Sequence, residues 1–356
     1  MSHFQPLTIA RVKRDTREAI QVSFEVPQPL KATFRYEPGQ HLTLRATIDG
    51  QELRRSYSIC SAVQDDELRI AIKKVSGGAF SGWANEHLAP GMRIDVMPPT
   101  GSFHRPLSGD DRHHYLAVAA GSGITPVFSI MRSTLLAEPG SRFTLVYGNR
   151  ASSTVMLRDE LADLKDSFLD RVSIVHVMSR EKQDIDLFNG RIDADKCRAL
   201  FRHWIPLDDI DHAFLCGPQP MMEAVSATLQ SLGMKKAQIH AELFGVANAA
   251  PSRAARPAVS SGQCEVTLII DGRHQSFSMP RDTLSVLDAG LQQGIDIRYA
   301  CKGGICATCR CKVVEGKADM DANHALEDYE VARGFVLSCQ AFPATDTLVL
   351  DFDQDA

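Results

Sequence analysis

The first third of the chain alternates between hydrophobic and polar residues in short runs. Four such runs cover residues 7–12, 21–26, 41–46 and 68–73, with turn-forming glycine and proline residues between them. Because successive side chains of a strand point to opposite faces, each run fits a strand with one buried side. Short strands at regular spacing are typical of a barrel. We therefore predict an antiparallel β-barrel over residues 1–108, with one helix after Gly78, from Ser81 to His87.

From residue 109 the pattern changes to apolar runs that alternate with helical segments. The apolar runs begin at Tyr115, Phe143, Val172 and Ala213, and helices are expected over 126–136, 153–164 and 220–232. Strands that alternate with helices are typical of a parallel sheet covered by helices. Residues 109–245 are therefore predicted to form an α/β domain with a parallel sheet.

Residues 246–263 lack any periodicity and consist mainly of Ala, Ser, Pro and Arg, so we interpret them as a linker. Residues 264–356 then form a last domain. Within it, Asp271-Gly272 lies between two strand-like runs and predicts a hairpin. A helix is expected over 285–292 and a final strand over 347–353.

Four cysteines of the last domain have the spacing of a plant-type [2Fe–2S] site. Cys301, Cys306 and Cys309 follow the pattern C-x4-C-x2-C, and Cys339 supplies a distant fourth thiol. We predict that these four ligate the cluster. A zinc site is one alternative, although structural zinc sites of this kind usually pair two C-x2-C units. Cysteines that bind no metal are the other, and Cys311 is interpreted as a bystander.

Composition narrows the class of protein. A chain of 356 residues suggests two or three domains, and its net charge of −5 does not favour nucleic acid. It has no run of 18 apolar residues and no apolar signal segment at its start. Nine cysteines with four grouped near one end fit metal ligation in a reducing compartment, so a soluble cytoplasmic protein is expected.

The acidic charge is concentrated in the last domain. Residues 264–356 hold 15 acidic and 8 basic residues, a net charge of −7. Such a surplus is either an ordinary solvated surface or a docking face for a basic partner, where complementary charge raises the encounter rate.

Two further motifs point to phosphate. Gly121-Ser-Gly123-Ile-Thr-Pro126 lies between an apolar strand and a helix, where free amides and the helix dipole favour an anion. By itself the motif is weak evidence for phosphate binding, since an ordinary strand-to-helix turn can have the same sequence pattern. In the barrel, Arg55-Ser-Tyr57-Ser58 offers a guanidinium for a diphosphate, an aromatic ring for stacking and a hydroxyl.

Taken in order along the chain, these motifs resemble the ferredoxin–NADP reductase superfamily. Arg-x-Tyr-Ser at 55–58 is followed by Gly-Gly-x-x-Ser at 77–81, Gly-x-Gly-Ile-Thr-Pro at 121–126 and Cys-Gly-Pro at 216–218. The last domain resembles plant-type ferredoxin, which implies an α+β fold of the β-grasp type. The resemblance covers nearly the whole chain and implies an NAD(P)H-dependent oxidoreductase with FAD and a [2Fe–2S] cluster.

The resemblance also assigns residues by motif. It implies FAD contacts, nucleotide contacts, and a catalytic group beside the flavin and nicotinamide rings. The FAD set is Arg55, Tyr57, Ser58, Gly77, Gly78 and Ser81; the nucleotide set is Gly121, Gly123 and Thr125; the catalytic set is Ser58, Cys216, Glu242 and Phe244.

The sequence favours NADPH over NADH. An acidic residue after the second strand of the nucleotide domain would select the free ribose hydroxyl of NADH, and none lies close to residues 147–150. Arg150 stands there instead, and Ser179-Arg180 follows the third strand. A hydroxyl and a guanidinium suit a 2′-phosphate, although Arg180 could also be an ordinary surface arginine.

The domain order of flavin, nucleotide and ferredoxin is shared with the reductase components of bacterial oxygenases. Residues 38–44, 53–60, 119–126, 147–150 and 299–309 are similar to the reductase subunits of phenylacetyl-CoA epoxidases. That similarity implies a multisubunit di-iron oxygenase of aerobic phenylacetate degradation as electron acceptor. Two alternatives remain: the reductase of another oxygenase, such as a Rieske-type steroid hydroxylase, and a ferredoxin-like electron-carrier subunit whose flavin half is inactive.

Overall fold

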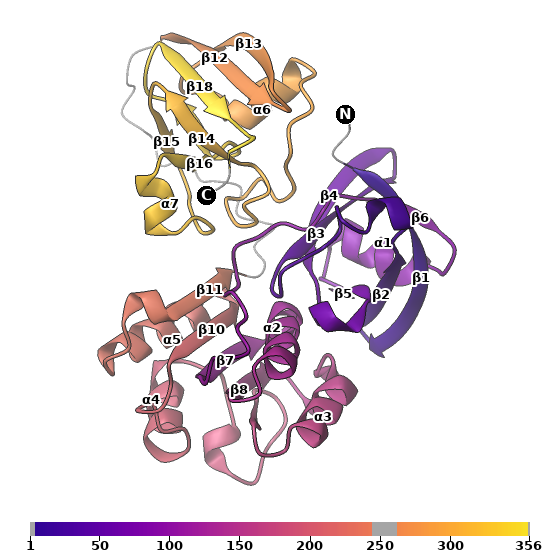
Figure 1. Cartoon of the computed structure of the whole chain (residues 1–356), viewed down its shortest axis with the longest axis vertical. Helices are drawn as coiled ribbons and strands as arrows, with labels where there is room; N and C mark the ends of the chain where they lie inside the picture. The colour runs from indigo at the N-terminus through magenta and orange to yellow at the C-terminus, as the bar shows by residue number, and fades with distance from the viewer. Residues whose placement is uncertain (1–3, 244–261, 355–356) are drawn as a thin grey trace. The chain divides into compact units, whose positions relative to one another are not determined.

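The computed structural model describes residues 4–243 and 262–354, and the chain divides into two compact units (Figure 1). The first unit contains the described residues 4–243 and the second the described residues 262–354. Within the described ranges, no helix is both long enough and apolar enough to cross a bilayer.

The N-terminal part of the first unit is the predicted antiparallel barrel. Its six strands pair in the order β4-β3-β6-β1-β2-β5, and a bridge between Ile59 and Ile70 joins the two ends of the sheet. The inward side chains form one apolar core that includes Leu7, Val22 and Leu44. The predicted helix begins two residues earlier than expected. The elements are β1 (Gln5–Thr16), β2 (Ala19–Glu25), β3 (His41–Ile48), β4 (Gln51–Ser58), β5 (Leu68–Lys73), α1 (Ala79–His87) and β6 (Arg93–Val96).

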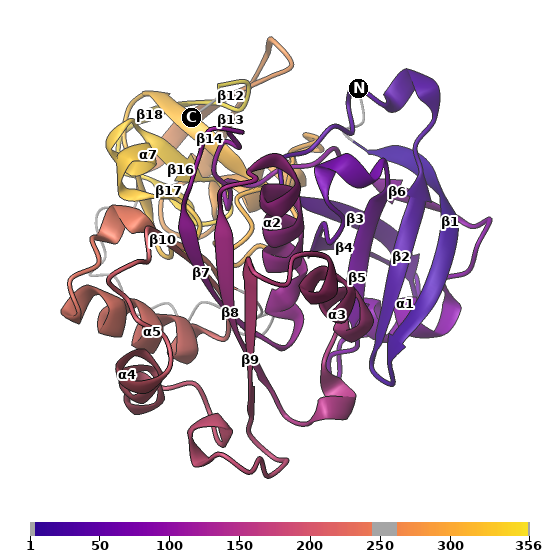
Figure 2. The same ribbon diagram turned by 60° about the horizontal axis from the view of Figure 1, so that its bottom comes forward.

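The second part of this unit is a five-stranded parallel sheet in the order β11-β10-β7-β8-β9, which confirms the predicted α/β domain. Helices α2 and α3 cover one face of the sheet, and α4 and α5 cover the other (Figure 2). The elements are β7 (His114–Ala120), α2 (Ile124–Ala137), β8 (Arg142–Asn149), α3 (Arg158–Ser167), β9 (Val172–Met178), α4 (Ala194–His203), β10 (His212–Gly217), α5 (Gln219–Ser231) and β11 (Ile239–Leu243).

One predicted helix of this domain was wrong at its start, and two elements were not predicted. The segment 153–164 begins with a 3-10 turn over Ser152–Thr154, and Leu157 has a left-handed backbone with φ of 54°. Because that conformation interrupts a helix, α3 starts only at Arg158. Helix α4 and strand β11 were not predicted, although at least half of the residues of each are apolar.

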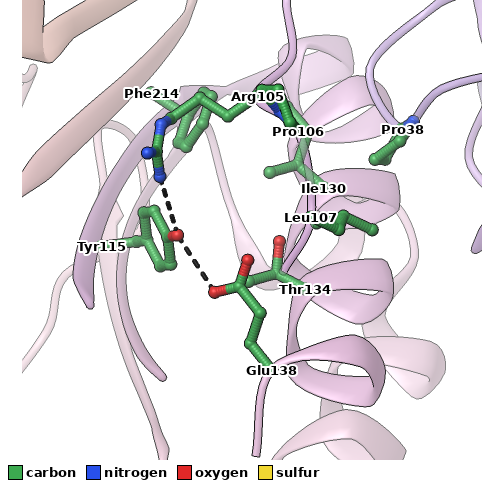
Figure 3. Close-up of a pocket in the computed structure, with 9 residues that line it drawn as sticks. All are labelled: Pro38, Arg105, Pro106, Leu107, Tyr115, Ile130, Thr134, Glu138 and Phe214. Carbon is green, nitrogen blue, oxygen red and sulfur yellow. Dashed lines mark hydrogen bonds between the residues drawn. The ribbon is translucent and has the colours of Figure 1, made fainter. Parts of the chain in front are cut away.

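Buried polar contacts hold the barrel against the parallel-sheet domain. The Ser129 hydroxyl donates to the Ser61 carbonyl oxygen at 2.7 Å, and the Leu157 amide donates to the Asp15 carboxylate at 3.2 Å. The connector 97–113 is bound as well: Arg105 donates to the Tyr115 hydroxyl, which donates to buried Glu138, each at 3.0 Å (Figure 3). These contacts set the relative position of the two halves of the site.

The second unit has the β-grasp arrangement that the resemblance implies. Its main sheet has the order β13-β12-β18-β14-β16, with a parallel pair β12–β18 at its centre. The predicted hairpin is confirmed, since Asp271 and Gly272 both have positive φ, at 50° and 69°. The elements are β12 (Gln263–Ile270), β13 (Arg273–Pro280), α6 (Val286–Gln292), β14 (Arg310–Glu315), β15 (Ala318–Met320), α7 (Asp328–Ala332), β16 (Phe335–Leu337), β17 (Ala341–Pro343) and β18 (Thr347–Asp351).

Strand β12 begins at Gln263, so the last residue of the predicted linker already pairs in the sheet, opposite Pro280. Gly262 is also described, and its carbonyl oxygen accepts from the Arg281 amide at 3.3 Å. The rest of the predicted linker, residues 246–261, lies outside the described residues.

Candidate functional site

Strand β4 and the start of α1 bring the flavin motif of the barrel together. The Tyr57 ring lies 5.8 Å from that of Phe80 on α1, and burial raises the pKa of the Tyr57 phenol. Arg55, two residues earlier, lies on the same face of the strand, and its guanidinium donates to the Arg54 carbonyl oxygen at 2.7 Å. The structure thus places the Tyr57 ring against the start of α1, with Arg55 on the same face of β4.

The Gly77-Gly78 turn leads directly into α1, and its shape depends on glycine. Gly77 has φ of +71°, and a Cβ at Gly78 would lie 2.6 Å from the Ser81 hydroxyl oxygen. That oxygen accepts from the Val75 amide at 3.1 Å and donates to the Gly78 carbonyl oxygen, so Ser81 holds the turn in place. No side chain caps the helix, which leaves its first amides for an anion. These groups fit the diphosphate of FAD.

Three of the four predicted catalytic residues meet where the barrel adjoins the parallel sheet. Cys216 on β10 and Glu242 on β11 are cross-strand neighbours, and the Ser58 hydroxyl from β4 donates to the Glu242 carboxylate. The other carboxylate oxygen, Oε2, is buried and has no hydrogen-bond partner among the described residues. The fourth predicted residue, Phe244, lies outside the described residues.

Burial controls the electrostatics of this group. It raises the pKa of Glu242 to about 8, partly offset by the bond from Ser58. It also raises the pKa of the Cys216 thiol, with a smaller contribution from the nearby Glu242 charge. Near neutral pH, therefore, both side chains are held mainly in their protonated forms. A protonated carboxyl at this position can donate a hydrogen bond.

The glycine loop after β7 packs directly on the end of β10. A Cβ at Gly123 would lie 2.2 Å from the Cys216 carbonyl oxygen, and Gly121 has φ of +55°. The Thr125 hydroxyl donates to the Ser122 carbonyl oxygen at 2.9 Å, so this predicted nucleotide contact shapes the loop from within. The loop can therefore approach a ligand with its backbone.

A cavity of about 630 Å³ opens beside this loop, over the carboxyl ends of β7, β8, β9 and β10. This is the edge where open α/β sheets bind nucleotides. The predicted residues Arg150, Ser179 and Arg180 line the cavity, and so do Lys73 and Arg191. None of these cations forms a salt bridge with any residue that the structure describes, whereas the Asp193 carboxylate accepts from the Lys196 amide at 2.8 Å. The cavity is suited to an anion with several charges.

Lys73 and Arg191 were not among the residues predicted from the sequence. Lys73 ends β5 of the barrel, and burial followed by repulsion from Arg150 lowers its pKa. Only the packing of barrel on sheet brings the two cations together, so no spacing along the chain could have revealed them. Arg191 follows Gly190 in an irregular segment for which the sequence offered no pattern.

In the second unit, the four predicted ligands form two pairs of thiols. Cys301 and Cys306 are hydrogen-bonded, as are Cys309 and Cys339. Among the described residues, no three His, Cys, Asp or Glu side chains converge on a position for a single ion. Two adjacent pairs instead fit a cluster in which each of two irons takes two thiolates.

Backbone amides surround these sulfur atoms. The Cys306 thiol and the amides of Gly303, Ile305 and Cys306 together lower the pKa of Cys301 to about 5. The Cys309 thiol and the Gly304 amide lower that of Cys339. Amides directed at thiolate sulfur are the groups that tune the potential of an iron–sulfur cluster. The residues therefore fit a [2Fe–2S] cluster.

Cys311 belongs to the core and not to this loop. It is 1 % exposed on β14, and its thiol points to the Val336 carbonyl oxygen at 3.7 Å. Burial raises its pKa well above the ordinary value. Its role as a bystander stays a prediction.

Comparison with known families gives matches over most of the chain. Residues 6–105 match the family model described as an oxidoreductase FAD-binding domain, and residues 117–227 match an oxidoreductase NAD-binding domain. Residues 268–344 match a 2Fe-2S iron-sulfur cluster binding domain.

Several curated proteins are similar over nearly the whole chain. One subunit of the 1,2-phenylacetyl-CoA epoxidase of Escherichia coli strain K12 is 47% identical, over 99% of each chain. The ferredoxin reductase component of 3-ketosteroid-9-alpha-monooxygenase from Rhodococcus rhodochrous is 35% identical, over 97% of this chain and 96% of the relative. Among solved structures, phthalate dioxygenase reductase is similar with a TM-score of 0.57 and 26% identity, over 98% of each chain.

Proposed function

Because the chain belongs to the family of oxygenase reductases with FAD-binding, NAD-binding and 2Fe-2S domains, we propose that it reduces the di-iron oxygenase of a phenylacetyl-CoA epoxidase with electrons from NADPH. The chain is an NAD(P)H-dependent oxidoreductase. The observation that carries the finer proposal is the 47% identity to one subunit of such an epoxidase over 99% of both chains.

The residues of the barrel and the sheet edge would bind the flavin and the nicotinamide. Arg55 and the amides at the start of α1 would hold the FAD diphosphate, and Tyr57 would pack on the ring. When bound, FAD supplies the conversion of a two-electron hydride into single electrons that an iron–sulfur cluster can accept. Buried Glu242, held by Ser58, would keep a proton beside the ring, and Cys216 would position the nicotinamide.

The charge of the nucleotide cavity supports NADPH. Lys73 and Arg150 lie close enough to repel each other, which an anionic diphosphate would relieve. Ser179 and Arg180 would take the 2′-phosphate, since a hydroxyl and a guanidinium both donate to phosphate oxygens.

Electrons would leave through the second unit. The proposed cluster ligands are Cys301, Cys306, Cys309 and Cys339, whose thiols form two pairs. We also propose the domain limits 1–108, 109–245 and 264–356 with a linker at 246–263, and a basic docking face on the oxygenase that meets the acidic last domain.

The test is reconstitution with purified epoxidase subunits. The purified chain should show both flavin and iron–sulfur absorbance, and should support NADPH-dependent epoxidation of phenylacetyl-CoA by those subunits. Flavin and cluster without support for epoxidation would contradict the proposed acceptor. Absence of flavin absorbance would instead favour a non-enzymatic electron carrier.

The alternative candidate for the electron acceptor is a Rieske-type steroid hydroxylase. It is supported by the 35% identity to the reductase component of a 3-ketosteroid-9-alpha-monooxygenase. The same preparation should be offered that oxygenase in parallel. Faster turnover with the hydroxylase than with the epoxidase would reverse the assignment.

A further inference from the structure

Gln340, the residue after the proposed ligand Cys339, has a buried side-chain amide that reaches across the proposed cluster loop. The residue is only 3% exposed. Its Nε2 donates to the Lys302 carbonyl oxygen at 2.9 Å and lies 3.8 Å from the Cys339 sulfur, a distance that the larger sulfur atom allows for a hydrogen bond. The amide nitrogen carries two hydrogen atoms, one for each bond. Because Lys302 directly follows Cys301, one side chain joins the two ends of the ligand set.

The backbone around Gln340 fixes the direction of this amide. The main-chain N–H of Gln340 donates to the Leu337 carbonyl oxygen at 2.8 Å, and its carbonyl oxygen accepts from the Asp321 amide at 3.0 Å. The side chain packs on the cluster loop, where a Cβ at Gly304 would lie 3.1 Å from the Gln340 Cγ. Lys302, whose carbonyl oxygen accepts from Nε2, has a left-handed backbone with φ of 53°, which residues other than glycine rarely adopt. The fold therefore holds the donor in place before a cluster binds.

The Cys339 sulfur receives the bond from Gln340 together with one from the Gly304 amide. A backbone donor follows from the fold of the loop, whereas the bond from Gln340 depends on the identity of one side chain. Reduction adds one electron to an iron–sulfur cluster, and the added negative charge makes its sulfur atoms stronger acceptors. A donor at Cys339 therefore stabilises the reduced form more than the oxidised form, which raises the reduction potential.

We infer that Gln340 is a positioning residue, whose Nε2 donates to the Cys339 sulfur of the bound cluster and raises the reduction potential of that cluster. This inference rests on the proposed electron transfer and on the proposed ligands, and it adds to them a side chain that ligates no iron. The step that Gln340 favours moves one electron from the reduced flavin, which is oxidised, to the cluster, which is reduced, and no bond forms or breaks.

A purely structural role of Gln340 gives a different expectation. If the side chain only braced the loop through the Lys302 carbonyl oxygen, its loss would change how firmly the cluster is retained. The potential of the retained cluster would then be that of the wild type. The reduction potential therefore distinguishes the two roles.

The test is a redox titration of the cluster in the full-length, flavin-loaded protein, followed by EPR, for wild type, Gln340→Met and Gln340→Glu. Methionine has nearly the length of glutamine but no donor. Glutamate keeps the shape, but its ionised carboxylate only accepts hydrogen bonds, and it adds a negative charge. The matched control is Gln275→Met on β13, which is exposed and lies at the opposite end of the sheet from β16, the strand that leads to Cys339.

At the wild-type midpoint potential, Gln340→Met should lower the ratio of reduced to oxidised cluster by about three- to tenfold, which for one electron is about 30–60 mV. Gln340→Glu should lower this ratio further, because a negative charge near the cluster is added to the loss of the donor. Gln275→Met should leave the ratio unchanged.

A retained cluster with the wild-type potential in both Gln340 variants would overturn the inference, while the proposed function would stand. If the variants retain no cluster, pulsed EPR of the reduced wild-type protein with ¹⁵N in its glutamine side-chain amides decides instead. Coupling of the cluster to a labelled nitrogen supports the inference, and absence of that coupling overturns it. A wild-type protein without an iron–sulfur EPR signal would overturn the proposed ligands as well as the inference.

Discussion

Replacement of Glu242 by glutamine should stabilise the first unit, and increasingly so as pH rises. The Glu242 carboxyl is buried, and its pKa rises from an ordinary 4.5 to about 8 in the folded chain. Between these values the folded protein keeps a proton that the unfolded chain releases. The free energy of unfolding of the wild type is therefore undiminished by Glu242 below pH 4.5, and it falls as pH rises through 8. Glutamine has a similar shape and does not titrate.

The magnitude follows from the size of the pKa difference. Each pKa unit corresponds to about 1.4 kcal/mol. Glu242 therefore lowers the free energy of unfolding of the wild type by at most about 2 kcal/mol at pH 6 and at most about 5 kcal/mol at pH 8 and above. For a unit of this size, 1 kcal/mol shifts the melting temperature by about 2–4 °C. We expect the advantage of Glu242→Gln to grow by at least about 5 °C between pH 5.5 and pH 8.5.

The assay is thermal unfolding of the flavin-loaded protein, followed by the fluorescence of released flavin at several pH values. Glu223→Gln, on the exposed side of α5, is the matched control and should show no growing advantage. A difference between Glu242→Gln and wild type that is the same at pH 5.5 and pH 8.5 would refute the reasoning, since it would mean that the carboxyl is ionised in the folded protein throughout that range.

Three further predictions concern the remaining parts of the site. Cys306→Ser should remove the iron–sulfur absorbance and electron delivery to the oxygenase but leave NADPH-dependent dye reduction by the flavin largely intact. The control Cys311→Ala should retain the cluster. Equal loss of both activities in Cys306→Ser would contradict this division of roles. Gly123→Ala should abolish hydride transfer from NADPH, because its Cβ would lie 2.2 Å from the Cys216 carbonyl oxygen. The control Gly82→Ala should be tolerated, because the atom nearest to its Cβ would be 4.0 Å away. Normal turnover in Gly123→Ala would show that the loop shifts freely. Lys73→Met should raise KM for NADPH and NADH alike, by about tenfold, with kcat nearly unchanged, because the diphosphate is common to both; a change for NADPH alone would move Lys73 to the 2′-phosphate.

The sequence by itself determined the features that depend on local spacing. Cys301, Cys306 and Cys309 must lie in one loop because so few residues separate them, and the glycines at 121 and 123 mark a tight turn wherever the chain goes next. Alternating and helical patterns likewise predicted the barrel and the parallel sheet, because they record which side of each element is buried. Helix α4 and strand β11 were not predicted from these patterns.

Only the tertiary structure decided which distant groups meet. Ser58 reaches Glu242 because the barrel packs against the end of the sheet, and Lys73 enters the nucleotide cavity for the same reason. Whether the pKa of Glu242 stays near its ordinary 4.5 or rises to about 8 depends on how much water and how many donors the packing leaves around the carboxyl. Burial is a property of the assembled fold, and no spacing along the chain specifies it.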